Sequence, residues 1–159
     1  INPIDSSIET DTLDLPAVSA QIMTPLHEND VNYVLDVGGD NVGTRVVGRF
    51  AEHFVEGEYD MFCVVNANRE QTQTAEEVVR SMEATSKLKV TGLINNTHFI
   101  RQTTVEDVLK GQKLAKEVSK LTNIPIKYVS CLRELVDSLP DDLEGDILPI
   151  DLYMREEWM

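Results

Sequence analysis

The apolar residues of this chain come in short continuous runs, and the segments between the runs carry apolar residues at helical spacing. The continuous runs cover residues 32–37, 61–65, 88–94 and 124–129. A strand that is covered on both faces needs apolar residues at successive positions, so each run predicts a buried strand. Strands that alternate with amphipathic helices predict an α/β fold with a mainly parallel sheet between two helical layers. The length of 159 residues suits a single domain, residues 1–159.

Helix signals set the expected boundaries between these strands. The amphipathic segments predict helices over residues 15–27, 46–55, 74–86, 105–121 and 131–139. Thr74-x-x-Glu77 and Thr103-x-x-Glu106 have the pattern of capping boxes, and Gly57 follows the second helix as a C-terminal stop. The acidic tail, residues 141–159, is expected to be mostly irregular, although residues 147–152 have the composition of an edge strand.

The charge of the chain limits its partners. There are 28 acidic and 14 basic residues, which gives a net charge of −14. Nucleic acids and anionic membranes both require clustered Lys and Arg, so neither is expected as a partner. No apolar run approaches the roughly 18 residues of a membrane span, and no signal peptide is visible, so a cytoplasmic location is expected. Cys63 and Cys131 lie in apolar surroundings and are expected to be buried reduced thiols, with a disulfide or metal pair as the alternative.

The first predicted strand ends in a motif that suits phosphate chemistry, Asp36-Val37-Gly38-Gly39-Asp40. A carboxylate at Asp36 is placed to hold Mg²⁺ through a water, and Gly38 or Gly39 would let a backbone N–H approach a phosphate without a Cβ in the way. Asp40 would then orient the attacking water. The alternative interpretation is an ordinary turn from strand to helix, where Asp and Gly are common.

Two other predicted strands also end in amides. Asn95 and Asn96 follow the third apolar run, and an amide offers the donor and acceptor pair that fits a purine edge. Simple turn residues are the alternative at that position. Asn66 and Asn68 follow the second run and are expected to satisfy loop backbone groups.

Together these strand ends resemble the MinD/ParA/CobQ group of P-loop ATPases, over about residues 13–130. Residues 36–42 look like the second switch of the nitrogenase iron protein, and residues 92–96 are similar to the strand that carries a base-recognising Asn in this group. The resemblance implies a P-loop NTPase-like fold that binds ATP and Mg²⁺. It implies a metal-binding role for Asp36, a γ-phosphate sensor at Gly39 and an adenine contact at Asn96, with Ser130 in a loop that approaches the adenine.

The departure from this family lies in the phosphate-binding loop. None of the eight glycines is followed by Lys, so the motif G-x-x-x-x-G-K-[ST] is absent, and the chain starts at Ile1. We therefore expect an N-terminally truncated ATPase that binds nucleotide weakly or not at all. In the family the phosphate-loop strand lies between the strands that correspond to residues 32–37 and 61–65, which predicts a gap in this sheet that other residues or another chain must fill.

Two other functions remain open from the sequence. The first is a nonenzymatic protein-interaction domain that acts through a dimer surface, with the acidic tail and Trp158 available for an unknown protein partner. The second is a ligase similar to dethiobiotin synthetase, in which Thr44, Arg45 and Arg49 would hold an anion, although solvent exposure also explains the two arginines. A homodimer is the expected assembly for the ATPase.

Overall fold

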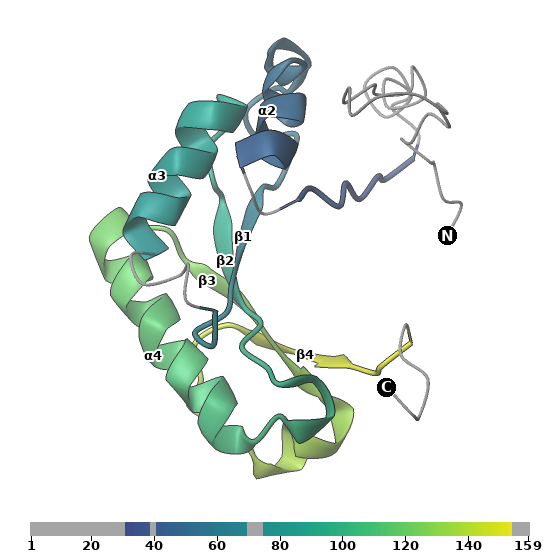
Figure 1. Cartoon of the computed structure of the whole chain (residues 1–159), viewed down its shortest axis with the longest axis vertical. Coiled ribbons are helices and arrows are strands. Elements are labelled where there is room, and N and C mark those ends of the chain that lie inside the picture. Colours follow the sequence, from purple (N-terminus) through teal and green to yellow (C-terminus); the bar gives the residue numbers. More distant parts are fainter. Residues whose placement is uncertain (1–30, 39–40, 70–74, 154–159) are drawn as a thin grey trace.

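Four parallel strands form the sheet, in the order in which they occur along the chain. The computed structural model describes residues 31–38, 41–69 and 75–153. The strands are β1 (Phe62–Val65), β2 (Gly92–Asn95), β3 (Ile126–Leu132) and β4 (Asp146–Ile150). Neighbours pair in the order β1-β2-β3-β4, so β1 and β4 are the edge strands of the sheet that the described residues form (Figure 1). The predicted α/β class with a parallel sheet is confirmed.

The α-helices that the structure describes gather on one face of this sheet. They are α2 (Asn41–Gly48), α3 (Ala75–Ser86) and α4 (Val105–Thr122). Helix α4 packs on β2 and β3, α3 packs beside α4, and α2 packs on α3 (Figure 1). The core lies between this layer and the sheet, where Cys63, Val65 and Leu93 are at most 1% exposed. The strands therefore bury their helix-facing side chains as expected from the apolar runs.

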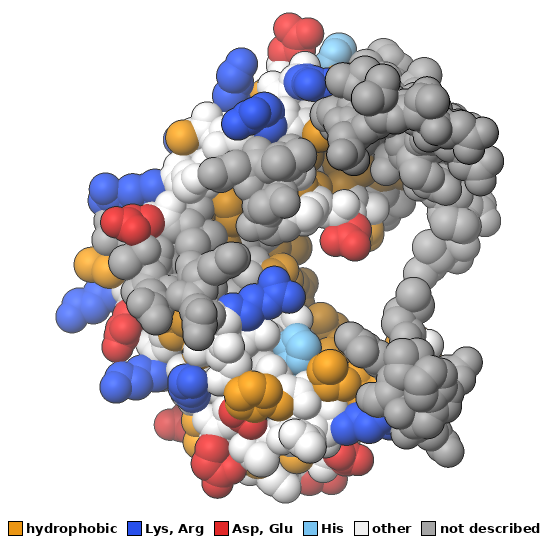
Figure 2. All heavy atoms as spheres, in the orientation of Figure 1, with side chains coloured by type: hydrophobic (Ala, Val, Ile, Leu, Met, Phe, Trp, Pro, Cys, Tyr) orange, Lys and Arg blue, Asp and Glu red, His pale blue; other side chains and the backbone are white. Residues whose placement is uncertain are grey.

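The opposite face of the sheet is less covered by the described residues. Val64 is 55% exposed, and Phe62, two positions earlier on the same face, packs its ring edge-to-face on Tyr128 with ring centroids 5.7 Å apart. The Phe62 ring lies over Gly92, where a Cβ would come within 3.0 Å of it. Figure 2 shows hydrophobic side chains at the surface of the described part of the molecule. A helical layer on this second face was predicted, and it is not among the described residues.

The prediction of a first strand over residues 32–37 is wrong. Residues 32–38 have no regular secondary structure, and they leave Val34 96% and Leu35 41% exposed. Figure 1 shows this segment running away from the sheet. An apolar run becomes a strand only where a neighbouring edge supplies hydrogen bonds, and residues 32–37 have no such pairing. Direct pairing between residues 32–37 and β1 would have excluded the predicted gap; the pairing is not observed, so the gap stays a prediction.

Two helix boundaries also differ from the predictions, for local reasons. Helix α2 starts at Asn41 and ends at Gly48, before most of the predicted 46–55 helix, and only a 3-10 turn, η2 (Ala51–His53), follows it. A Cβ at residue 48 would collide with the carbonyl oxygen of Thr85, so glycine there permits the close contact of α2 with α3 while weakening the helix. The capping box of α4 is formed by Thr104 and Asp107, one position later than predicted.

The remaining elements follow the predictions more closely. Strand β2 starts only at Gly92, because side chains bond the backbone N–H groups just before it: the Ser86 hydroxyl accepts from Leu88 N and the Glu83 carboxylate from Val90 N. Strand β3 extends past residue 129 to Leu132, and the helix predicted over 131–139 is a 3-10 segment, η5 (Arg133–Ser138). Strand β4 confirms the predicted edge strand in the acidic tail. The helix predicted over 15–27, the cap at Thr74 and Trp158 lie outside the described residues.

Candidate functional site

The end of β2 carries the two amides that the sequence singled out, and the structure gives them different surroundings. The Asn95 side chain is fully buried; its Nδ2 donates to the Val108 carbonyl at 2.9 Å and its Oδ1 accepts from the Thr97 backbone at 3.2 Å. Asn96 lies one residue beyond the strand and is half-buried. Its backbone N–H donates to Val65 O at 2.8 Å, which continues the β1–β2 ladder.

Ser130 connects β3 to this strand end. It lies within β3 rather than in the predicted loop, and it is 6% exposed. Its hydroxyl lies 2.7 Å from Oδ1 of Asn96 and 3.1 Å from the carbonyl oxygen of Asn95. Among the described residues, Nδ2 of Asn96 has no hydrogen-bond partner, and Oδ1 keeps one lone pair beyond the contact with Ser130. Asn96 therefore presents one donor and one acceptor at the carboxyl end of the sheet, where ligands bind in open α/β sheets.

A small polar network under this strand end holds Asn96 in place. Thr97 is 1% exposed, and its hydroxyl accepts from the Ala67 backbone at 3.0 Å. Gly111 of α4 lies against it: a Cβ there would collide with Oδ1 of Asn95 and Oγ1 of Thr97. The absence of a side chain at Gly111 thus lets the loop after β2 pack directly on α4.

The loop after β1 is joined to the first turns of α4. Asn68 donates from Nδ2 to Asp107 Oδ1 at 3.2 Å and accepts from Lys110 Nζ at 2.8 Å, while the Asn66 side chain accepts from Asn68 N. The hydrogen bond from the Thr104 backbone is the main cause that lowers the pKa of Asp107. The prediction that these asparagines satisfy loop backbone groups is confirmed for Asn66, whereas the Asn68 side chain bonds two side chains of α4 instead.

Of the proposed phosphate and metal residues, the two that the structure describes, Asp36 and Gly38, are not brought to this strand end. Asp36 and Gly38 lie in the 31–38 segment, which does not join the sheet, and the backbone of Gly38 contacts Gly43 of α2. Gly39 and Asp40 lie outside the described residues. A search of the described part of the chain finds no group of three His, Cys, Asp or Glu residues that could hold a metal ion.

The three residues considered for a ligase site do not share one surface. Thr44 is 1% exposed, whereas Arg45 and Arg49 are exposed. The alternative prediction, that both arginines are exposed to solvent, is confirmed.

The cysteines match the sequence prediction. Cys63 and Cys131 are free and at most 3% exposed. Burial raises the pKa of the Cys63 thiol to about 11 and also raises that of Cys131, so both are protonated at neutral pH. A buried protonated thiol is a poor nucleophile.

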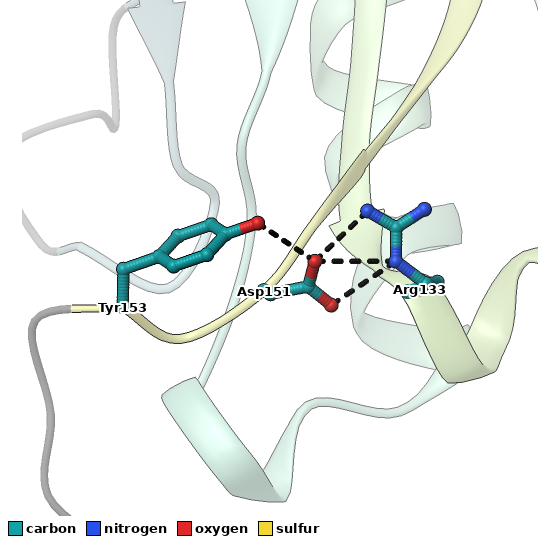
Figure 3. Close-up of polar contacts among 3 residues, drawn as sticks. All are labelled: Arg133, Asp151 and Tyr153. Atoms are coloured by element: carbon teal, nitrogen blue, oxygen red, sulfur yellow. Dashed lines mark hydrogen bonds and ion pairs between the residues drawn. The ribbon is translucent and has the colours of Figure 1, made fainter.

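A second polar cluster lies at the carboxyl ends of β3 and β4 (Figure 3). Arg133 donates from Nε and Nη2 to the Asp151 carboxylate, the shortest contact being 2.8 Å, and the Tyr153 hydroxyl donates to the same carboxylate at 2.9 Å. These exposed groups tie the end of the last strand to η5. The hydrogen bond from Arg133 is the main cause that lowers the pKa of Asp151.

Sequence reasoning missed Thr97, Gly111 and the link from Asn68 to α4. Gly111 left a signal, because a glycine inside an otherwise regular amphipathic helix costs about 1 kcal/mol relative to Ala and indicates a close approach. Thr97 and Asn68 left none, since their partners are 30 or more residues away along the chain.

Comparison with protein-family models, with curated proteins and with solved structures finds no match to this chain. None of the described helices is both long enough and apolar enough to cross a membrane.

Proposed function

We propose that this chain is the base-binding part of an ATP-binding switch protein of the MinD/ParA/CobQ type. The observation that carries the proposal is the Asn96 amide at the carboxyl end of a parallel strand, with Oδ1 next to the Ser130 hydroxyl and Nδ2 without a partner among the described residues. Adenine carries an amino donor beside a ring-nitrogen acceptor, and an Asn amide is complementary to that pair. The residues present therefore fit the base.

The open edge of β1 also supports this function. Among the described residues β1 pairs only with β2, and the segment that carries Asp36 stays unpaired. The resemblance places a phosphate-loop strand between those two segments, so the free edge agrees with it. In an ATPase of this type, Asp36 would hold Mg²⁺ through a water, Gly39 would sense the γ-phosphate and Asp40 would position the attacking water. Mg²⁺ usually keeps several waters and binds one or two carboxylates together with the phosphates, so a single carboxylate is compatible with it.

Three finer features belong to the same proposal. The sheet would carry helices on both faces, as in a P-loop NTPase-like fold, and the protein would act as a homodimer in the cytoplasm. Nucleotide binding by this chain would be weak, because the loop that makes most phosphate contacts in such proteins is absent from its sequence.

A titration with Mg·ATP, followed by nuclear magnetic resonance at millimolar nucleotide, tests the proposal. We expect saturable shifts at Asn96 and Ser130, which Asn96→Ala should abolish. Gln102→Ala is the matched control, because it removes an exposed amide from the nearby η4 segment (Ile100–Gln102). If the wild-type chain shows no shift at either residue, or if Asn96→Ala responds as the wild type does, this function is wrong.

A nonenzymatic interaction domain is the second candidate, and one observation favours it. The edge of β1, which no described residue pairs, and the sheet face beside it, where Val64 is 55% exposed, provide backbone groups and apolar area for another chain. Light scattering on the purified chain would distinguish the two: a stable dimer that ignores nucleotide supports this candidate and not the ATPase.

A further inference from the structure

We propose that Ser130 is a positioning residue that fixes the orientation of the Asn96 amide and thereby selects adenine over guanine. The inference rests on the proposed function, because it concerns the base that Asn96 would contact. It goes beyond a direct Ser130–adenine contact, which is what the sequence resemblance implied.

The distances indicate which group donates to which. A separation of 2.7 Å between Ser130 Oγ and Oδ1 of Asn96 is typical of O–H···O bonds, whereas N–H···O bonds cluster near 2.9–3.0 Å. The carbonyl oxygen of Asn95, the other acceptor within reach of the hydroxyl, is farther away at 3.1 Å. The Ser130 hydroxyl has a single proton, and we assign that proton to the shorter of the two contacts. Oδ1 of Asn96 is therefore held toward β3, and Nδ2 is left to donate to a ligand.

The backbone around both residues makes this arrangement rigid. Ser130 is part of β3 and is paired with Leu148 of β4. Asn96 is fixed by its N–H bond to Val65 O, and the preceding Asn95 is anchored on α4 through the Val108 carbonyl. With the backbone fixed, the Asn96 side chain keeps rotation about its two side-chain bonds, and the contact with the Ser130 hydroxyl restricts both.

The orientation of the amide decides which base it accepts. Adenine offers an amino donor next to a ring-nitrogen acceptor, whereas guanine offers a carbonyl acceptor next to a ring N–H donor on its Watson–Crick edge. An amide turned by 180° exchanges donor and acceptor and would suit guanine. A fixed amide therefore rejects guanine by leaving like groups face to face, and a free amide accepts either base.

The orientation can be measured without nucleotide. In the wild-type chain we expect weak nuclear Overhauser contacts between the Asn96 side-chain NH₂ protons and the Ser130 β-protons, because the amide oxygen faces Ser130. Strong contacts would show the opposite orientation and would overturn the inference, whether or not ATP binds.

The selectivity is measured as the ratio of the dissociation constants for GTP and ATP. In Ser130→Ala we expect the preference for ATP to fall by about tenfold, since a bidentate amide contact discriminates between bases by about 1–3 kcal/mol. Ser130→Thr, which keeps the hydroxyl, should restore the preference. If Ser130 has only a packing role, Ser130→Ala would weaken the binding of ATP and GTP equally and leave the ratio of their dissociation constants unchanged. That result would also overturn the inference. If the wild-type chain binds neither nucleotide, the proposed function fails and the selectivity role fails with it, whereas the Overhauser measurement still reports the amide orientation.

Discussion

Gly111 is the residue that most constrains the candidate site although it has no side chain. It lies in the middle of α4 and is buried against Asn95 and Thr97. The Thr97 hydroxyl accepts from Ala67 of the loop after β1, and the Asn95 amide donates to Val108 of α4, so neither side chain can move away without losing a hydrogen bond. A glycine in a helix is usually unfavourable, and here the close contact with the loop after β2 compensates for that.

Gly111→Ala should therefore destabilise the chain in spite of the higher helix propensity of Ala. We expect the free energy of unfolding, measured by urea denaturation, to fall by about 1–3 kcal/mol, the usual range for forcing extra atoms into a packed interior. Lys113→Ala, at an exposed position of the same helix, should change it by less than about 0.5 kcal/mol. An unfolding free energy for Gly111→Ala equal to or above that of the wild type would show that the loop can move away from α4.

At the scale of elements, the N-terminus of α4 combines a helix cap with a contact between distant segments. Thr104 and Asp107 cap each other reciprocally, and Asp107 also accepts from Asn68 of the loop after β1. The pKa of Asp107 is lowered, so its stabilising effect is present above the pKa of the unfolded state, about 3.9. The effect is lost as the pH falls through the lower pKa of the folded state.

Asp107→Asn should consequently lower the free energy of unfolding at pH 7 more than at pH 2. The reason is that the charged carboxylate accepts the stronger capping bonds, and this contribution is lost progressively as the pH falls through the lowered pKa of the folded state. The measurement is urea denaturation at both pH values, with Glu106→Gln as the neighbouring control in the same first turn. Equal losses at the two pH values would contradict the role of the carboxylate charge.

The link between β3 and β4 makes a second prediction at this scale. Arg133 holds the Asp151 carboxylate with two nitrogens, and this hydrogen bonding lowers the pKa of Asp151. Arg133→Gln should raise that pKa toward its usual range, as followed by a carbon-detected titration of the carboxylate. Tyr153→Phe removes a smaller contribution and should raise it less. If the pKa of Asp151 is the same in Arg133→Gln and in the wild type, the ion pair of Figure 3 does not persist in solution.

The elements that the sequence predicts well are those whose signal is local. The runs around β1 and β3 and the long periodic stretch of α4 are assigned correctly, because burial on the helix-facing side requires apolar residues there. Residues 32–37 have the same local signal as these strands, and they fail because pairing depends on a neighbouring edge that local sequence does not encode. The end of α2 at Gly48 depends on its contact with α3. The residue contacted there, Thr85, is also far from Gly48 along the chain.

The candidate site divides in the same way. Asn96 is recognisable because a polar residue directly after an apolar run lies at the carboxyl end of a strand. Its contacts are not recognisable. Ser130 is named by the family resemblance, but as a loop residue, whereas it reaches Asn96 from within β3, and the packing of Thr97 and Asn95 against a helix glycine has no local signal. The sequence indicates which residue is presented, and the tertiary contacts determine how it is oriented.

At the scale of the whole molecule, the sheet has one covered face and one that the described residues cover only in part. The strands are apolar at successive positions, including Val64 and Ile94, which point away from the α-helices. Parallel sheets are almost always buried on both faces, because their crossover connections place helices there. Phe62 and Tyr128 protect part of the second face by packing on each other across Gly92. The three-layer arrangement that we propose requires further residues or another chain to pack on the rest of it.

Val64→Lys tests that arrangement directly. If the second face is covered, a buried ammonium without a partner should lower the free energy of unfolding by at least about 2 kcal/mol. Leu121→Lys is the matched control. Leu121 is 64% exposed on α4 and Val64 is 55% exposed, so the two variants should lose a similar free energy of unfolding if nothing else packs on the sheet. The measurement is urea denaturation of both variants over a range of protein concentrations. A concentration-dependent loss in Val64→Lys would identify a second copy as the cover, and a concentration-independent loss would identify residues of the same chain. Losses below about 0.5 kcal/mol in both variants would show that the second face is open to solvent and that the three-layer proposal is wrong for this chain.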